Sequence, residues 1–191
     1  MTKDDVIALP NPNLRKKSDK VGIITPEILK IIANMKAATI SWDHSREHEV
    51  GVALAAVQIN QLYKIIVVRN NYEDKEDISF SAFINPIITK LEGSLEEDFE
   101  GCLSVQDIYG KVPRYTKIRV KALDERGQTF RVTAEGFLAR IFQHEIDHIA
   151  GVMFIDHIKD KPDAFFKLKD DGSLEQLDYA KSVKNNKELW N

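Results

Sequence analysis

Apolar residues recur at helical spacing in two segments of the chain. Within residues 26–39 a proline occupies the first helical position, and the apolar residues that follow are Ile28, Leu29, Ile31, Ile32 and Met35. Within residues 136–150 the apolar residues are Leu138, Ile141, Phe142, Ile146 and Ile149. Gly151 follows where a helix-terminating glycine belongs. The pattern predicts two helices, and the second is largely buried.

The middle of the chain has the β-branched runs and alternation that are typical of strands. Residues 64–69 form a β-branched run between polar residues, and residues 82–91 have strand character. Residues 116–134 have the pattern of a hairpin with its turn at 124–127. Residues 6–20 contain two prolines and are expected to form an irregular arm. The sequence therefore predicts an α+β fold, with mixed, mostly antiparallel strands around a buried helix.

Composition and charge narrow the class of protein. Forty-three per cent of the 191 residues are hydrophobic and 30% are charged, which is typical of a globular domain with a core. Twenty-seven Lys plus Arg against 30 Asp plus Glu leave a net charge of −3, which gives no indication of nucleic acid or an anionic membrane as the main partner. The longest uncharged run, residues 50–63, is too short to span a membrane. The acidic start does not resemble a signal peptide, so we expect a soluble, cytoplasmic protein.

Two histidines lie four residues apart inside the predicted buried helix. His144 and His148 share one helix face, so both imidazoles can bind one cation, with Glu145 beside them. Burying two histidines and their acidic neighbours in one apolar turn is costly, which favours a metal over two satisfied core histidines. A second pair at the same spacing, His44 and His48, lies in a wholly polar segment, where a solvated loop or helix end is the preferred interpretation.

Two imidazoles leave a catalytic metal one protein ligand short. A metzincin protease would supply a third histidine, but Phe154 occupies that position. Another protease class takes a downstream glutamate, and the candidates Glu175 and Glu188 lie in a polar segment. Cys102, the single cysteine, is the better third ligand, because a thiolate binds first-row divalent ions tightly and the residue lies in a glycine-flanked stretch. His157 stands alone and is given no role.

Three motifs, in this order along the chain, resemble those of peptide deformylases. Glu100-Gly-Cys-Leu-Ser-Val105 and Gln143-His-Glu-Ile-Asp-His148 are similar to two of the family's signatures. Gly51-Val-Ala-Leu-Ala-Ala-Val-Gln58 resembles the third, Gly-x-Gly-Leu-Ala-Ala-x-Gln. Together with the arm Pro10-Asn-Pro-Asn-Leu-Arg-Lys-Lys17, the resemblance covers residues 6–158. It implies a peptide deformylase-like fold around a metal-binding helix.

The resemblance implies a metal-dependent hydrolase that removes the N-formyl group from N-formylmethionine of new polypeptides and releases formate. Such enzymes usually hold Fe(II), although Zn or Ni can occupy the site. By motif, the metal ligands would be Cys102, His144 and His148. Glu145 would take a proton from the attacking water and later protonate the departing amine. The Gln58 amide and the Leu103 backbone N–H would stabilise the oxyanion.

The residues support this chemistry independently. A preorganised donor such as Gln58 is worth about 2.7 to 4 kcal/mol in the transition state, although capping a strand end is an alternative role. Glu100 is expected to support the metal site by pairing with a basic residue such as Arg114. The alternative for this pair is a surface ion pair worth under about 1 kcal/mol.

Two positions depart from the family pattern. Ala53 replaces the usual second glycine, and its methyl is expected to crowd the substrate. Tyr109 falls about where many relatives carry arginine, so a positive charge is missing there.

Two other functions stay open. The first is a metallopeptidase, and the second is a catalytically silent, deformylase-like binding protein that retains the metal.

The resemblance also divides the chain. We expect a catalytic domain over residues 1–158 and a C-terminal helical tail over 159–191, which includes a third helix predicted over 174–190. Seven Lys balance seven acidic residues in this tail, so its charge identifies no partner. The expected partners are the N-formylmethionyl nascent polypeptide and, transiently, the ribosome, with no direct nucleic-acid specificity and no membrane.

Overall fold

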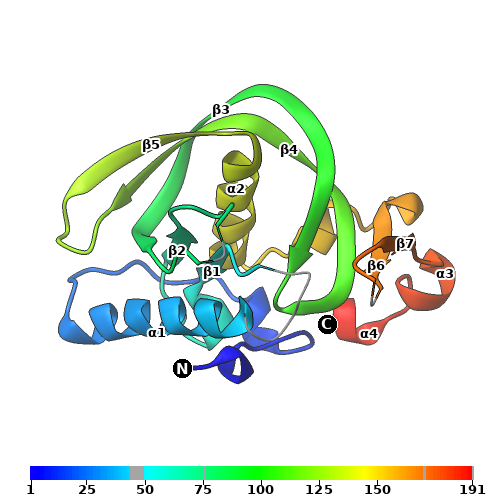
Figure 1. The fold of residues 1–191 in the computed structure, drawn as a ribbon, viewed down its shortest axis with the longest axis horizontal. Coiled ribbons are helices and arrows are strands. Elements are labelled where there is room, and N and C mark those ends of the chain that lie inside the picture. Colours follow the sequence, from blue (N-terminus) through cyan, green and yellow to red (C-terminus); the bar gives the residue numbers. More distant parts are fainter. Residues whose placement is uncertain (44–49, 75, 170, 191) are drawn as a thin grey trace.

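A long, bent hairpin crosses over a central helix in the computed structural model, which describes residues 1–43, 50–74, 76–169 and 171–190. The helix is α2 (Gly136–Ala150), and the hairpin consists of β3 (Phe80–Cys102) and β4 (Val105–Leu123), as Figure 1 shows. The remaining larger elements are α1 (Pro26–Asp43), β1 (Ala53–Ala55), β2 (Ile65–Arg69), β5 (Thr129–Glu135), β6 (Phe165–Leu168) and β7 (Leu174–Gln176). Short 3₁₀ turns lie at Lys3–Asp5, Pro12–Arg15, Ala56–Ile59, Phe154–His157 and Pro162–Ala164. The predicted α+β class is confirmed.

Within the described residues the strands form one sheet in the order β1-β2-β3-β4-β6-β7, and β5 pairs with a second stretch of β4. These ladders are antiparallel, and a single parallel bridge joins Asp19 to Tyr63. The β3–β4 register shifts at four places, and such bulges bend a ladder. The bend curls the hairpin around α2, so that the Cys102 end of β3 comes back to face this helix (Figure 1).

Two helices cover opposite faces of the β1–β2 pair. Alternate residues of β2 point to opposite sides: Ile65 and Val67 join the cluster under α1, whereas Ile66 and Val68 join the cluster under α2. Burial on both faces explains why β2 is an unbroken β-branched run rather than an alternating strand. This packing fixes the position of β1 relative to α2. In the sequence, β1 comes after residues 44–49, which the structure does not describe.

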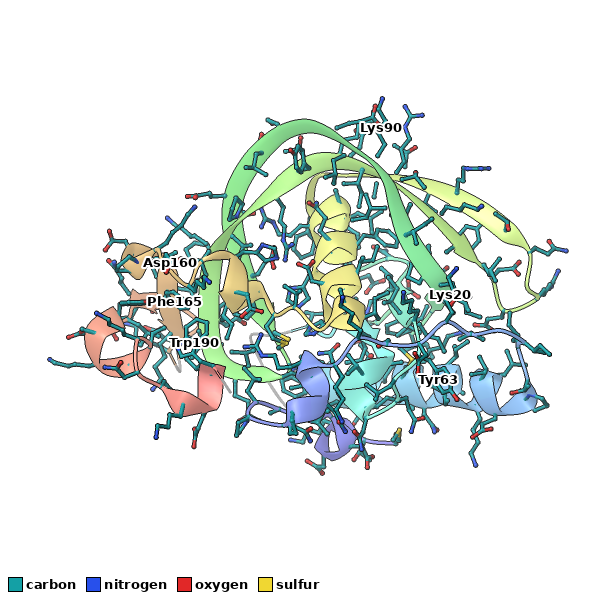
Figure 2. All side chains as sticks on the ribbon, turned by 180° about the vertical axis from the view of Figure 1, so that it is seen from behind. Lys20, Tyr63, Lys90, Asp160, Phe165 and Trp190 are labelled. Atoms are coloured by element: carbon teal, nitrogen blue, oxygen red, sulfur yellow. The ribbon has the colours of Figure 1, made fainter. Side chains whose placement is uncertain are left out.

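A third cluster joins the C-terminal segment to the rest of the molecule. Phe165 is fully buried, and its ring lies 5.6 Å from that of Tyr179 and 6.5 Å from that of Trp190, measured between centroids. The same cluster includes Leu14 and Val112. Figure 2 shows Phe165 and Trp190 at the end of the molecule opposite Tyr63. The segment therefore packs against residues from the start and the middle of the chain.

The prediction of one helix over 174–190, and with it of a helical tail over 159–191, is wrong. The segment contains β7 and two single-turn helices, α3 (Tyr179–Ser182) and α4 (Lys187–Trp190). Gly172 adopts a φ of 78°, which turns the chain so that β7 pairs with β6. The Asp178 carboxylate accepts a hydrogen bond from the Lys181 N–H and begins α3. These local hydrogen bonds divide a segment whose composition alone permits a helix.

Most other predicted elements are confirmed. The helix predicted over 26–39 continues to Asp43, and the helix over 136–150 has the predicted bounds. The strand predicted over 82–91 continues to Cys102. The additional stretch is charged and exposed and has no apolar alternation that would predict a strand, but pairing with β4 holds it extended. His44 and His48 lie outside the described residues. No helix that the structure describes is long and apolar enough to cross a membrane.

Gly151 terminates α2 in a conformation that only glycine adopts readily. Its φ is 78°, and an added Cβ would lie 2.5 Å from the Arg15 backbone oxygen. Gly136, at φ 56°, has no atom within 4 Å of such a Cβ. We expect Gly136→Ala to lower the free energy of unfolding by about 1–2 kcal/mol, for backbone strain alone. Gly151→Ala should cost about 1–3 kcal/mol more, because the neighbouring backbone must also move.

Urea unfolding of both variants measures the difference. Equal losses would contradict this account and would show that the Arg15 segment gives way without cost.

Candidate active site

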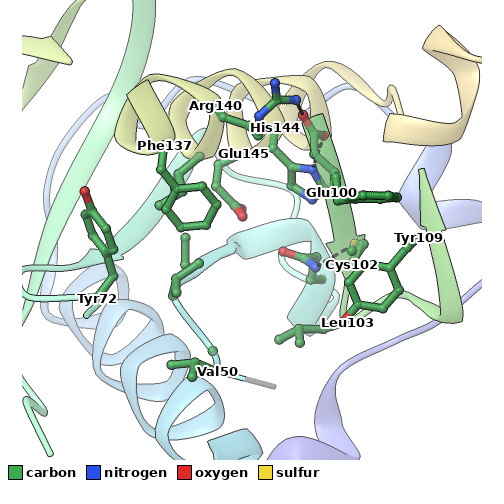
Figure 3. Close-up of a pocket in the computed structure, with 17 residues that line it drawn as sticks. Val50, Tyr72, Glu100, Cys102, Leu103, Tyr109, Phe137, Arg140, His144 and Glu145 are labelled. Atoms are coloured by element: carbon green, nitrogen blue, oxygen red, sulfur yellow. Dashed lines mark hydrogen bonds and ion pairs between the residues drawn. The ribbon is translucent and has the colours of Figure 1, made fainter. Parts of the chain in front are cut away.

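Three segments far apart in the sequence meet beside α2. The end of β3 and its turn supply Cys102 and Leu103, the 3₁₀ turn after β1 supplies Gln58, and α2 supplies His144, Glu145 and His148. Five of these six side chains line one cavity of about 430 Å³, and His148 lies behind them, 1% exposed. Figure 3 shows Glu145 and Cys102 facing this cavity from the helix and the strand. The structure brings together every site residue that the sequence predicts.

A thiol and two imidazole nitrogens converge at the floor of the cavity. Cys102 Sγ lies 3.2 Å from His148 Nε2, which lies 3.2 Å from His144 Nε2. The three atoms all lie within 4.8 Å of one another. A tetrahedral ion with metal–nitrogen bonds of about 2.0–2.1 Å and a metal–sulfur bond of about 2.3 Å places neighbouring ligand atoms about 3.3–3.6 Å apart. The donor set and its spacing therefore fit one first-row divalent metal.

The Glu100 carboxylate orients His144 and binds two arginines; we call this cluster of Glu100, Arg114, Arg140 and His144 the Glu100 network. One carboxylate oxygen accepts hydrogen bonds from Arg114 Nε at 2.8 Å and Arg140 Nη1 at 2.9 Å. The other accepts from Arg114 Nη2 at 3.1 Å and lies 2.9 Å from His144 Nδ1. With Nδ1 held by this carboxylate, Nε2 of His144 faces the cavity. The predicted Glu100–Arg114 pair is confirmed, and it is buried rather than a surface ion pair.

Burial and pairing act in opposite directions on the Glu100 carboxyl. Burial raises its pKa, but the hydrogen bonds to His144 and Arg114 outweigh burial and hold the pKa far below its usual range. The pKa of the His144 imidazole shifts in the opposite direction. Burial lowers the pKa of His144, but its contacts with Cys102 and Glu100 raise it well above the ordinary value. Glu100 is therefore an anion at any physiological pH.

Arg140 is a supporting residue that the sequence analysis misses. Arg140 is 7% exposed, and its guanidinium donates to the backbone oxygens of Val112, at 2.7 Å, and Glu96, at 2.9 Å, as well as to Glu100. It therefore fastens α2 to both strands of the hairpin. The signal was present: Arg140 lies four residues before His144, on the same helix face.

A second ion pair extends this network to the surface. Asp147 Oδ2 accepts from Arg114 Nη1 at 2.6 Å and lies 2.7 Å from His157 Nε2. Burial raises the pKa of Asp147, but the hydrogen bond to His157 and the charge of Arg114 lower it overall. The expectation that His157 stands alone is wrong, because the turn after α2 folds it back onto the helix.

Glu145 has an environment opposite to that of Glu100. Its side chain is buried, and its Oε2 is without a hydrogen-bond partner in the described part of the chain. Burial raises its pKa to about 7, and the charge of Glu100 adds to this effect while that of His144 opposes it. A carboxyl with such a pKa can both accept and donate a proton near neutral pH.

Gln58 is held in one amide orientation. Its Oε1 accepts a hydrogen bond from the Ala55 N–H at 2.8 Å, so Nε2 must point the other way, toward Ser104 Oγ at 3.2 Å and Cys102 Sγ at 3.7 Å. The predicted alternatives, a capping role and a place in the site, are thus both present in one side chain. The donor end of the amide lies beside the thiol.

The cavity wall is largely apolar. It includes Ala53 of β1, an outer strand of the sheet, together with Tyr72, Phe137 and Tyr109. Figure 3 shows Tyr72 and Phe137 on the side away from Cys102. An apolar cavity whose floor carries metal-ligating donors and a carboxyl with a pKa near 7 has the organisation of a metal-dependent hydrolase.

Comparison with known proteins gives the family. The sequence model for polypeptide deformylases matches residues 3–163. The peptide deformylase of Thermomicrobium roseum is 38% identical over 159 residues, which cover 82% of this chain and 86% of that protein. Peptide deformylase 2 of Clostridium acetobutylicum is 41% identical over 143 residues, or 75% and 87% of the two chains.

The fold agrees with the sequence match. The crystal structure of a peptide deformylase from Synechococcus elongatus in complex with actinonin superposes with a TM-score of 0.73 at 34% identity, covering 82% of this chain and 80% of that one. This chain belongs to the polypeptide deformylase family, metal-dependent hydrolases that remove the N-formyl group from N-formylmethionine in nascent polypeptides.

Glu100→Gln tests whether the Glu100 network stabilises the fold and orients His144. The neutral amide leaves two buried guanidinium groups without this anion, so we expect the free energy of unfolding to fall by about 3–5 kcal/mol. Metal affinity should fall about 10–100-fold, because His144 loses its carboxylate partner. Glu92→Gln is the matched control, since Glu92 pairs with Arg119 at the surface. Glu92→Gln should change neither the free energy of unfolding nor the metal affinity measurably. Equal effects of the two substitutions would contradict the role of the Glu100 network.

Proposed function

We propose that Cys102, His144 and His148 hold one divalent metal, Fe(II) in the cell with Zn or Ni able to replace it. The observation that carries the proposal is the convergence of these three donors within 4.8 Å of one another. The family's usual metal supports the choice of Fe(II), and a thiolate with two imidazoles is compatible with all three ions.

The metal, when bound, would act as a Lewis acid that polarises the formyl carbonyl and activates water. Glu145 takes the proton of the attacking water and returns it to the methionine nitrogen as the carbon–nitrogen bond breaks. Its raised pKa, about 7, suits both steps. The Gln58 Nε2 donor and the Leu103 backbone N–H stabilise the developing oxyanion. Each donor of this kind is worth about 2.7–4 kcal/mol.

The cavity also explains how a formylated peptide would be oriented. β1 is an outer strand, so an extended peptide can pair with its backbone while the methionine side chain enters the apolar cavity. Ala53 is 7% exposed and lies along this path, which supports the expectation that its methyl crowds the substrate.

We further propose that residues 1–158 carry the catalysis and that the protein acts in the cytoplasm, where it meets nascent chains in transient contact with the ribosome. All six proposed site residues lie within this range. The net charge of −3 supports action on the polypeptide rather than specific binding to nucleic acid.

The decisive experiment compares formyl-Met-Ala-Ser with unformylated Met-Ala-Ser, using anaerobically purified protein of known metal content. We expect formate from the first peptide, no cleavage of the second and one metal ion per chain. Cleavage of Met-Ala-Ser would instead identify a metallopeptidase. One bound metal without turnover of either peptide would identify a binding protein.

Glu145→Gln should lower kcat/KM on the formylated peptide at least about 100-fold, because it removes the proton carrier. Metal content and urea stability should stay as in the wild type, since neither oxygen of Glu145 is a proposed ligand. Glu27→Gln, on the exposed first turn of α1, serves as the control. A variant within about threefold of the wild-type rate would remove Glu145 from the mechanism.

A further inference from the structure

The N-terminal arm is bound to the rest of the protein at both of its ends. Near its start, the Lys3 N–H donates a hydrogen bond to Ser41 Oγ of α1 at 3.2 Å. Near its far end, the Ser18 N–H donates to the Ile149 backbone oxygen of α2 at 3.0 Å. Residues 6–9 lie between these two points and are half-buried. The middle of the arm is therefore held against the protein.

This middle part donates hydrogen bonds to the two segments that carry the proposed oxyanion donors. The Ile7 N–H donates to the Gln58 backbone oxygen at 2.8 Å, and the Leu9 N–H donates to the Ser104 backbone oxygen at 2.9 Å. Gln58 belongs to the 3₁₀ turn after β1. Ser104 follows Leu103 in the two-residue turn between β3 and β4. Two residues of the arm thus connect turns that are distant in the sequence.

A side-chain hydrogen bond closes this connection into a ring. Gln58 Nε2 donates to Ser104 Oγ at 3.2 Å. Gln58 is 2% exposed and Ser104 is 0% exposed, so their backbone oxygens have little access to water and need donors from the protein. The arm supplies both donors. We call Ile7, Leu9, Gln58 and Ser104 the arm ring.

We propose that the arm ring sets the distance between the two oxyanion donors, so that Ile7 and Leu9 are positioning residues for the reaction. The proposal rests on the proposed function. An oxyanion donor acts only where charge develops in the transition state, and a misplacement of about 1 Å can cost about 100-fold in rate. The Gln58 amide and the Leu103 N–H lie in separate turns, so their separation depends on what joins these turns. Besides the arm ring, Val6 and Leu103 pack against the same hydrophobic cluster.

The test replaces Leu9 by its α-hydroxy acid. This change turns one backbone N–H into an ester oxygen, keeps the leucine side chain and removes the hydrogen bond to Ser104. We expect kcat on formyl-Met-Ala-Ser to fall about tenfold and KM to stay within about twofold, because the oxyanion exists only in the transition state. The loss is smaller than the roughly 100-fold expected when a donor is removed, since both donors remain present.

Leu177 offers the matched control. Its N–H donates to the Phe165 backbone oxygen at 2.9 Å, so the same hydroxy acid removes a hydrogen bond of the same length outside the arm ring. Both esters should lower the urea midpoint to a similar extent, because each removes one backbone hydrogen bond. The Leu177 ester should keep kcat within about twofold of the wild type. An ester at Ile7 is the second variant, and it should reproduce the loss of kcat.

Equal kcat values for the Leu9 and Leu177 esters would overturn the proposal, and so would a rise in KM without a fall in kcat. If the wild type hydrolyses no formylated peptide, the proposed function fails. Solvent exchange of the Gln58 side-chain amide protons, followed by NMR in the Zn-loaded protein, then tests the arm without turnover. The exchange should be faster in the Leu9 ester than in the Leu177 ester, and equal rates would refute the role of the arm ring.

Discussion

The buried carboxylate of Glu100 is the constraint on which the rest of this structure depends. It lies on β3, and its partners come from β4 and α2, so one charge joins the three elements that build the site. A buried anion is costly unless its partners surround it in good geometry, and removing one partner is strongly destabilising. The observed placement of the hairpin over the helix makes all of these bonds. That placement also sets Cys102 beside His144 and His148.

Two glutamates separated by 45 positions illustrate how the fold assigns chemical roles. Glu100 is surrounded by guanidinium groups and an imidazole, and its pKa is strongly lowered. Glu145 faces an apolar cavity, and burial raises its pKa to about 7. The first is a permanent anion that orients a ligand, whereas the second can exchange protons at neutral pH. The residue type is the same, and the number of positive charges within reach decides the function.

The sequence could predict what depends on local periodicity. The helix over 136–150 followed from apolar spacing and the glycine at its end, and the i, i+4 histidines followed from the helix. Motif resemblance brought Cys102 and Gln58 to the same site. The second half of β3 was not predictable, because its charged residues are extended only by pairing with β4. The contacts of Arg140 and His157 with β3 and β4 depended in the same way on partners distant in the sequence, whereas the β6–β7 hairpin is set by a local turn at Gly172 that composition did not reveal.

X-ray absorption at the metal edge of anaerobically purified protein tests the central claim most directly, because it reads the atoms bound to the metal. The account predicts one sulfur at about 2.3 Å and two imidazole nitrogens at about 2.0–2.1 Å from the protein. In Cys102→Ser the sulfur contribution should disappear. A wild-type spectrum without sulfur, or one that Cys102→Ser leaves unchanged, would contradict the assignment of Cys102, His144 and His148 as the metal site.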